Sequence, residues 1–171
     1  LYTKPTINTS EIYQFLNNIN GLNLYPKFAE IINIKEETLI PKLIEYLKID
    51  AATRLCVKPI DWGEAPFYLS ISDVAMELLE VKTYCDFFDN ASHSQKLFSN
   101  TNKNEKDKLL SEIDHWYERT KSLSKSEKVE YFLDSICPIG HSYTFTCHNL
   151  LFAEDTMLAK KMYNKYYNQL S

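Results

Sequence analysis

Four side chains near the end of the sequence have the types and spacing for metal or thiol chemistry. They are Cys137, His141, Cys147 and His148. Zn²⁺ is bound by such groups, but structural zinc sites usually draw two separated ligand pairs, whereas Cys147 and His148 are adjacent. A Cys137–Cys147 disulfide is therefore the simpler interpretation. A Cys147 nucleophile with a histidine base would lack the flanking glycines of an oxyanion hole, so we predict no catalytic residue.

A second group of side chains lies in the stretch 56–69, which contains two prolines, a glycine and three large aromatics. We predict a packed loop, because such residues favour turns over helix. The two carboxylates of the stretch could support acid–base catalysis or bind a sugar or a cation. The aromatics could pack on the core or face a protein partner, and partner contact fits them better than catalysis. The predicted partner-binding residues are Asp61, Trp62, Glu64, Phe67 and Tyr68.

The cysteines bear on the compartment in which the protein works. There are four, Cys56, Cys85, Cys137 and Cys147, and an even number permits three complete pairings. A disulfide would place the protein in the periplasm or outside the cell, whereas buried thiols would suit the cytoplasm. The sequence begins at Leu1 rather than Met, which removal of a secretory signal would explain as well as trimming would. We expect a periplasmic or secreted protein, with the cytoplasm as the alternative.

The charged residues argue against nucleic acid as a partner. The chain has 23 acids and 19 bases, for a net charge of −4, and only Arg54 and Arg119 are arginines. The bases are scattered among acids, whereas phosphate neutralisation needs clustered Lys and Arg. No apolar run approaches the ~20 residues of a membrane-spanning helix, so we predict no transmembrane segment. We also predict no cofactor.

The elements that must position these side chains are predicted to be helices. Only three glycines occur among 171 residues, too few for the tight turns of an all-β fold, and apolar residues recur every three or four positions. This length matches one domain, so we predict a single helical domain over residues 1–171. A polar stretch near 89–106 is typical of a mobile surface connection. The predicted helices cover residues 9–20, 26–33, 41–50, 70–84, 109–121, 124–136 and 149–170, the last docking on the others.

Capping residues mark several of these helix starts. Ser124 and Glu127 form the pattern of a capping box, and Ser70 with Asp73 gives the same pattern with a shorter acid. Pro41 suits the first position of its helix, where a missing amide hydrogen costs nothing. Each box predicts a helix that begins directly after its serine.

Three stretches of the sequence carry a family resemblance: residues 39–47 (LIPKLIEYL), 71–80 (ISDVAMELLE) and 116–124 (WYERTKSLS). They resemble HEAT-like helical-repeat proteins, especially small bacterial ones, over residues 36–136. The resemblance implies an irregular antiparallel helical array, or α-α superhelix, of about six to eight helices that bury their apolar faces by stacking. The chain departs from the family in lacking a clean period of about 40 residues, and residues 141–170 lie outside the resemblance. Such a fold implies a binding or scaffold role.

The predicted function is a non-enzymatic protein-binding or scaffold domain. One specific version is an exported bacterial immunity-type protein, which neutralises a toxin by covering its active site. The small size and acidity of the chain suit that role. The alternative is a metal-dependent or carboxylate hydrolase that uses the Cys137–His148 region or Asp61 and Glu64. A measurement of bound metal would separate the metal-dependent form of this alternative from the binding role.

Overall fold

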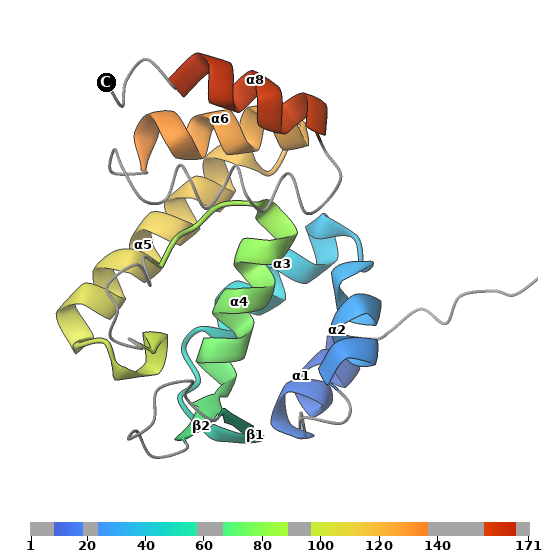
Figure 1. The fold of residues 1–171 in the computed structure, drawn as a ribbon. Coiled ribbons are helices and arrows are strands. Elements are labelled where there is room, and N and C mark those ends of the chain that lie inside the picture. Colours follow the sequence, from blue (N-terminus) through green and yellow to red (C-terminus); the bar gives the residue numbers. More distant parts are fainter. Residues whose placement is uncertain (1–8, 19–23, 58–66, 89–96, 137–155, 167–171) are drawn as a thin grey trace, which may run out of the picture. The chain divides into compact units, whose positions relative to one another are not determined.

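The computed structural model describes residues 9–18, 24–57, 67–88, 97–136 and 156–166 (Figure 1). Of these residues 72% are helical, in seven α-helices, and the sheet that they contain has only two strands. The predicted all-α class with about six to eight helices is therefore confirmed for the part of the chain that the structure describes.

The chain divides into two compact units, and each is described by itself. The first unit comprises residues 1–79 and 97–100, and the second comprises residues 80–96 and 101–171. The division falls within helix α4 (Ile71–Thr83). The chain therefore enters the first unit a second time for only four residues.

Three helices open the first unit, α1 (Thr9–Asn18), α2 (Leu24–Ile32) and α3 (Glu36–Tyr46). Their apolar residues recur at helical spacing, so each helix can turn one face inward. Helix α1 contacts both α3 and strand β1 (Ala52–Val57). Among the residues of the three helices whose burial the structure describes, the buried apolar ones are Ile12, Leu16, Ile31, Leu39, Ile40, Leu43, Ile44 and Tyr46.

Helix α3 corrects the predicted role of Pro41. The helix begins at Glu36, so the proline lies inside it and not at its first position. Because proline has no amide hydrogen, the carbonyl of Glu37 cannot receive the usual bond from position 41. The proline is exposed, so water can satisfy that carbonyl. Two glutamates in the first turn favour the earlier start, because they face the positive end of the helix dipole.

A β-hairpin corrects the packed loop predicted for residues 56–69. Strand β1 pairs antiparallel with β2 (Phe67–Ser70), and Cys56 stands opposite Tyr68. The register is irregular between Ala52 and Cys56, as in a β-bulge. The prolines and the glycine of the stretch fall in residues 58–66, which lie outside the described residues.

Strand β1 shows the alternation that a half-buried strand requires. Thr53 and Leu55 are buried, whereas Arg54 and Cys56 are exposed. The hydroxyl of Thr53 donates to the carbonyl of Leu69 on β2 (2.8 Å), which secures the hairpin where its register is irregular. The alternation covers only four residues, which is too short to stand out among helical patterns.

The N-terminus of α4 confirms the capping box predicted at Ser70 and Asp73. The amide of Asp73 donates to Ser70 Oγ (3.0 Å), while Asp73 Oδ2 accepts from the amide (2.8 Å) and the hydroxyl (2.7 Å) of Ser70. Ser99, in the short 3₁₀ helix η1 (Phe98–Asn100), donates its amide to Asp73 Oδ1 (2.8 Å) and its hydroxyl to Oδ2 (2.8 Å). One buried carboxylate therefore joins the end of β2, the start of α4 and η1.

The second unit begins with the last turn of α4 and an irregular but buried segment. Tyr84 follows the helix with a φ of 60°, a left-handed conformation that is rare for a tyrosine. The ring of Phe87 packs edge-on against Trp116 (5.1 Å between centroids) and Phe132 (5.0 Å). Glu80 Oε1 accepts a hydrogen bond from the amide of Phe88 (2.7 Å), which fixes the course of the segment.

Helix α5 (Lys103–Thr120) begins before residue 106, where the predicted polar connection was expected to end. Asn102 caps this helix by accepting a hydrogen bond from the amide of Glu105 (3.0 Å). Phe98, within the predicted connection, is buried, with only 2% of its surface exposed. The first turns of α5 are largely exposed, so they carry no apolar periodicity that would mark them as helix. Residues 89–96 lie outside the described residues.

Helix α6 (Lys125–Ser135) follows α5 after a short turn and confirms the second predicted capping box. The amide of Ser124 donates to Glu127 Oε2 (2.8 Å), and Ser124 Oγ accepts from the amide of Glu127 (3.5 Å). Trp116 on α5 is buried and donates its ring nitrogen to the carbonyl of Lys128 on α6 (3.4 Å). The tryptophan thereby joins the two helices, which contact each other.

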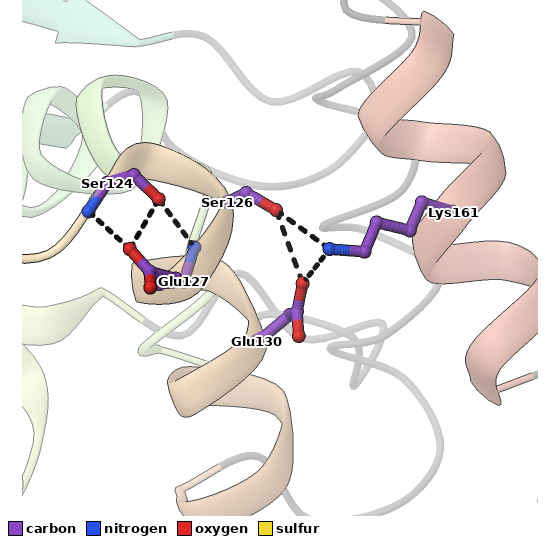
Figure 2. A network of polar contacts seen from close by, with 5 residues as sticks. All are labelled: Ser124, Ser126, Glu127, Glu130 and Lys161. Carbon is purple, nitrogen blue, oxygen red and sulfur yellow. Dashed lines mark hydrogen bonds and ion pairs between the residues drawn. The ribbon is translucent and has the colours of Figure 1, made fainter.

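Helix α8 (Thr156–Tyr166) is the described part of the helix predicted over residues 149–170. Figure 2 shows how its Lys161 reaches α6. The Lys161 ammonium forms an ion pair with Glu130 and donates to Ser126 Oγ (3.3 Å), while the Ser126 hydroxyl donates to Glu130 Oε1 (3.2 Å). This polar network lies at the surface, since Lys161 is exposed.

Candidate partner-binding surface

The structure places two of the five predicted partner-binding residues. Phe67 and Tyr68 are the first residues of β2. Asp61, Trp62 and Glu64 lie outside the described residues, within the chain that connects the two strands. The described residues Phe67 and Tyr68 lie on the hairpin of β1 and β2, part of which is exposed.

The outward side of this hairpin presents three side chains of different chemistry. Tyr68 is 62% exposed, and Cys56 stands opposite it on β1 and is also exposed. Arg54 is exposed two positions before Cys56. We call Arg54, Cys56 and Tyr68 the outer hairpin face. The face contains a tyrosine and an arginine, and both residue types are enriched in binding hot spots.

The other side of the hairpin holds the outer hairpin face in place. Leu55 is buried, and its amide donates to the hydroxyl of Thr53 (3.1 Å). Backbone bonds extend the pairing beyond the strands, from Ile71 to the carbonyl of Ala51 (2.9 Å) and from Ser72 to that of Ile49 (2.9 Å). Because the hairpin is fixed at its base, the exposed tyrosine is presented on a rigid element.

The structure describes two of the four cysteines that were predicted as disulfide candidates. Cys56 is exposed in the first unit, Cys85 is buried in the second, and both are thiols in the structure. The sulfur of Cys85 lies 3.6 Å from the carbonyl oxygen of Thr83, its hydrogen-bond acceptor. The two remaining candidates, Cys137 and Cys147, lie outside the described residues. Which of the four cysteines pair with each other stays a prediction.

The metal and acid–base hypotheses find no support in the described part of the chain. His141 and His148 lie outside it, and within it no three His, Cys, Asp or Glu side chains gather to hold a metal ion. Partial removal from water raises the pKa of the Glu77 carboxyl above its ordinary value, although the residue is exposed on α4. Desolvation causes that shift, so no second charged group among the described residues marks Glu77 as part of an acid–base pair.

Two exposed residues of β1 were not predicted to bind a partner. Arg54 was not a candidate for any site, and Cys56 was a candidate only for a disulfide. The residue types from Thr53 to Val57 do not alternate between polar and apolar, so the only signal for a strand is the β-branched pair Thr53 and Val57. Once that strand is recognised, Cys56 and Arg54 follow as outward residues.

No family model, curated protein or solved structure matches this chain. None of the described helices combines the length and the apolar character that crossing a bilayer requires. A functional proposal must therefore rest on the chemistry and exposure of the chain's own residues.

Proposed function

We propose that this chain is a non-enzymatic helical protein that binds another protein through its outer hairpin face. The observation that carries the proposal is Tyr68, a large aromatic side chain that is 62% exposed on a strand whose partner strand is anchored in the core. A tyrosine supplies a large apolar contact area and a hydroxyl while losing few rotamers on binding. An exposed, rigidly held tyrosine is thus suited to anchor an interface.

The neighbours of Tyr68 support the same role. Arg54 adds a planar cation that can pair with a partner carboxylate or stack on an aromatic ring. The connecting residues 58–66 contribute Asp61, Trp62 and Glu64 to the same hairpin in the sequence. Aromatic and charged residues around one anchor would supply both affinity and specificity.

The specific form of the proposal is an exported bacterial protein of the immunity type, which covers the active site of a toxin. The net charge of −4 supports it, because an acidic chain is attracted to the basic surface of a toxin that binds nucleic acid. A HEAT-like arrangement of the helices belongs to the same proposal, since such folds present an extended binding surface.

Binding measurements with matched tyrosine variants test the role of the hairpin. The partner is first isolated with the immobilised chain from its native lysate, and each variant is then titrated by calorimetry. Tyr68→Ala is expected to raise the Kd by roughly tenfold or more, as truncation of a hot-spot residue does. Tyr163→Ala, at a second exposed tyrosine on α8, is expected to change the Kd by less than about threefold. Equal effects of the two variants would contradict the assignment.

Thiol counting tests export. The structure has Cys56 and Cys85 as thiols, so the disulfide that we propose in support of export joins Cys137 and Cys147. Under denaturing, non-reducing conditions we then expect two reactive thiols per chain, from these two cysteines. Four reactive thiols would contradict the exported form of the proposal while leaving protein binding untouched.

A further inference from the structure

The carboxylate of Asp73 collects hydrogen bonds from two segments that are distant in sequence. Ser70, at the end of β2, gives two of them, and Ser99, in η1, gives the other two. The hydroxyls of both serines donate to the same oxygen, Oδ2. Hydrogen bonds to a buried charged acceptor are stronger than neutral ones, so this carboxylate is a firm attachment point.

The segment that contains Ser99 is short, and the residues before and after it belong to the second unit. Residues 97–100 belong to the first unit, whereas residues 80–96 and 101–171 belong to the second. The amide of Asn100 bonds to the carbonyl of Leu97 (3.1 Å), which closes a single turn, and the ring of Phe98 is buried. The buried ring of Phe98 and the two hydrogen bonds from Ser99 to Asp73 both hold this segment in the first unit.

We propose that residues 97–100 form a releasable strap, that Asp73 is its latch, and that the end of β2 controls the latch through Ser70. The strap opens by local unfolding when Ser99 leaves the carboxylate. Since Ser70 and Ser99 share Oδ2, a movement of Ser70 changes the position of the oxygen that holds Ser99. Strand β2 and the strap are thereby coupled, whether or not the hairpin binds a partner.

The strap also leads directly to a helix start. One residue, Thr101, separates Asn100 from Asn102, the N-cap of α5. When the strap opens, the chain just before this N-cap loses its attachment to Asp73. The first turns of α5 follow next in the chain and are largely exposed, so they are the part of the second unit that we expect to respond first.

Amide hydrogen exchange measured by NMR on the full chain tests the strap. In Ser99→Ala we expect the amides of Ser99 and Asn100 to exchange at least about tenfold faster, because one charge-assisted hydrogen bond is lost. The amide of Leu47, which bonds to the carbonyl of Leu43 (3.0 Å), should keep its rate, since the opening is local. Ser99→Thr retains the hydroxyl and should retain slow exchange.

The coupling to β2 is tested with two matched serine variants. Ser70→Ala should also accelerate exchange at Ser99 and Asn100, although the substitution lies in another segment. Ser124→Ala removes the equivalent hydroxyl from the capping box of α6 and should leave both amides unchanged. Should Ser70→Ala fail to fold, Asp73→Asn tests the same link, because an amide side chain has one acceptor oxygen in place of two.

Two results would overturn the proposal. One is an unchanged exchange rate at Ser99 in Ser70→Ala, which would show that the latch does not respond to β2. The other is a uniform acceleration of Ser99, Asn100 and Leu47 in Ser99→Ala, which would show that these amides open only when the whole unit unfolds.

Discussion

Helices α4 and α6 begin with the same arrangement, a serine that caps the helix and an acid three residues later that returns a bond to the amide of the serine. In α4 both Ser70 and Asp73 are buried, and the acid also holds Ser99. In α6 both Ser124 and Glu127 are exposed, and the side chain of Glu127 accepts its hydrogen bonds from Ser124, within its own box. One local motif thus begins a helix in both places and organises tertiary structure in only one of them.

The difference teaches that burial decides how much a capping box contributes. An exposed box exchanges protein hydrogen bonds for bonds to water at small net gain. A buried box has no water to replace its partners, so every lost bond leaves an unsatisfied group. Removing the same atoms from the two boxes should therefore have unequal effects.

The largest effect is expected from removal of the buried acid. Asp73→Ala deprives the amides of Ser70 and Ser99 of their acceptor and should lower the free energy of unfolding by roughly 3–5 kcal/mol. Glu127→Ala, at the exposed box, should have a far smaller effect. Urea denaturation followed by circular dichroism measures both, and similar midpoints for the two variants would contradict the role assigned to burial.

A smaller effect is expected at the two capping serines. Ser124→Ala should cost about 1 kcal/mol or less, which is typical of an exposed N-cap. Ser70→Ala should cost about 2 kcal/mol, because the Ser70 hydroxyl also contacts that of Ser72 (2.8 Å) within the buried cluster. Thermal unfolding of the two variants at one pH compares them directly, and a larger loss in Ser124→Ala would reverse the ranking.

The sequence was sufficient for the parts of the fold that depend on neighbouring residues. Both capping boxes could be predicted because serine and acid lie three residues apart, and the helical class follows from apolar spacing. The bonds from Ser99 to Asp73 could not, because 26 residues separate the two and only the tertiary fold brings them together. Tyr68 could be predicted as a candidate from its residue type. Its exposure on a strand could not, because the sequence analysis predicted a loop where the structure has a hairpin.

The acid of the exposed box gives a prediction on pH. The hydroxyl and then the amide of Ser124 hold the pKa of Glu127 below its ordinary value of 4.5. The hydrogen bonds from Ser124 to ionised Glu127 contribute fully to the free energy of unfolding at a pH above 4.5. This contribution is lost as the pH falls through the lowered pKa of the folded chain, because the unfolded chain takes up the proton at a higher pH. In Ser124→Ala the pKa should rise toward 4.5. A carboxyl NMR titration measures it, and an unchanged midpoint would refute the stated cause.

The smallest effect on the free energy of unfolding is expected at the ion pair between Lys161 and Glu130, drawn in Figure 2 beside the exposed capping box. The Lys161 and Glu130 side chains are 59% and 25% exposed, so water and salt screen their ion pair. Lys161→Met keeps the apolar stem and should lower the free energy of unfolding by about 0.2–1 kcal/mol. Denaturation at low and high salt measures the change, and a loss that is independent of salt would argue against an electrostatic origin.

The left-handed backbone at Tyr84 has a consequence for how this sequence can evolve. Glycine or asparagine adopts that conformation at lower cost, so selection for stability alone would remove the tyrosine. The ammonium of Lys125 lies 3.8 Å above the tyrosine ring, an attraction that only an aromatic residue at position 84 can offer. Positions 84 and 125 should therefore change together among descendants of this sequence, with glycine or asparagine at 84 accompanied by relaxed selection for a cation at 125.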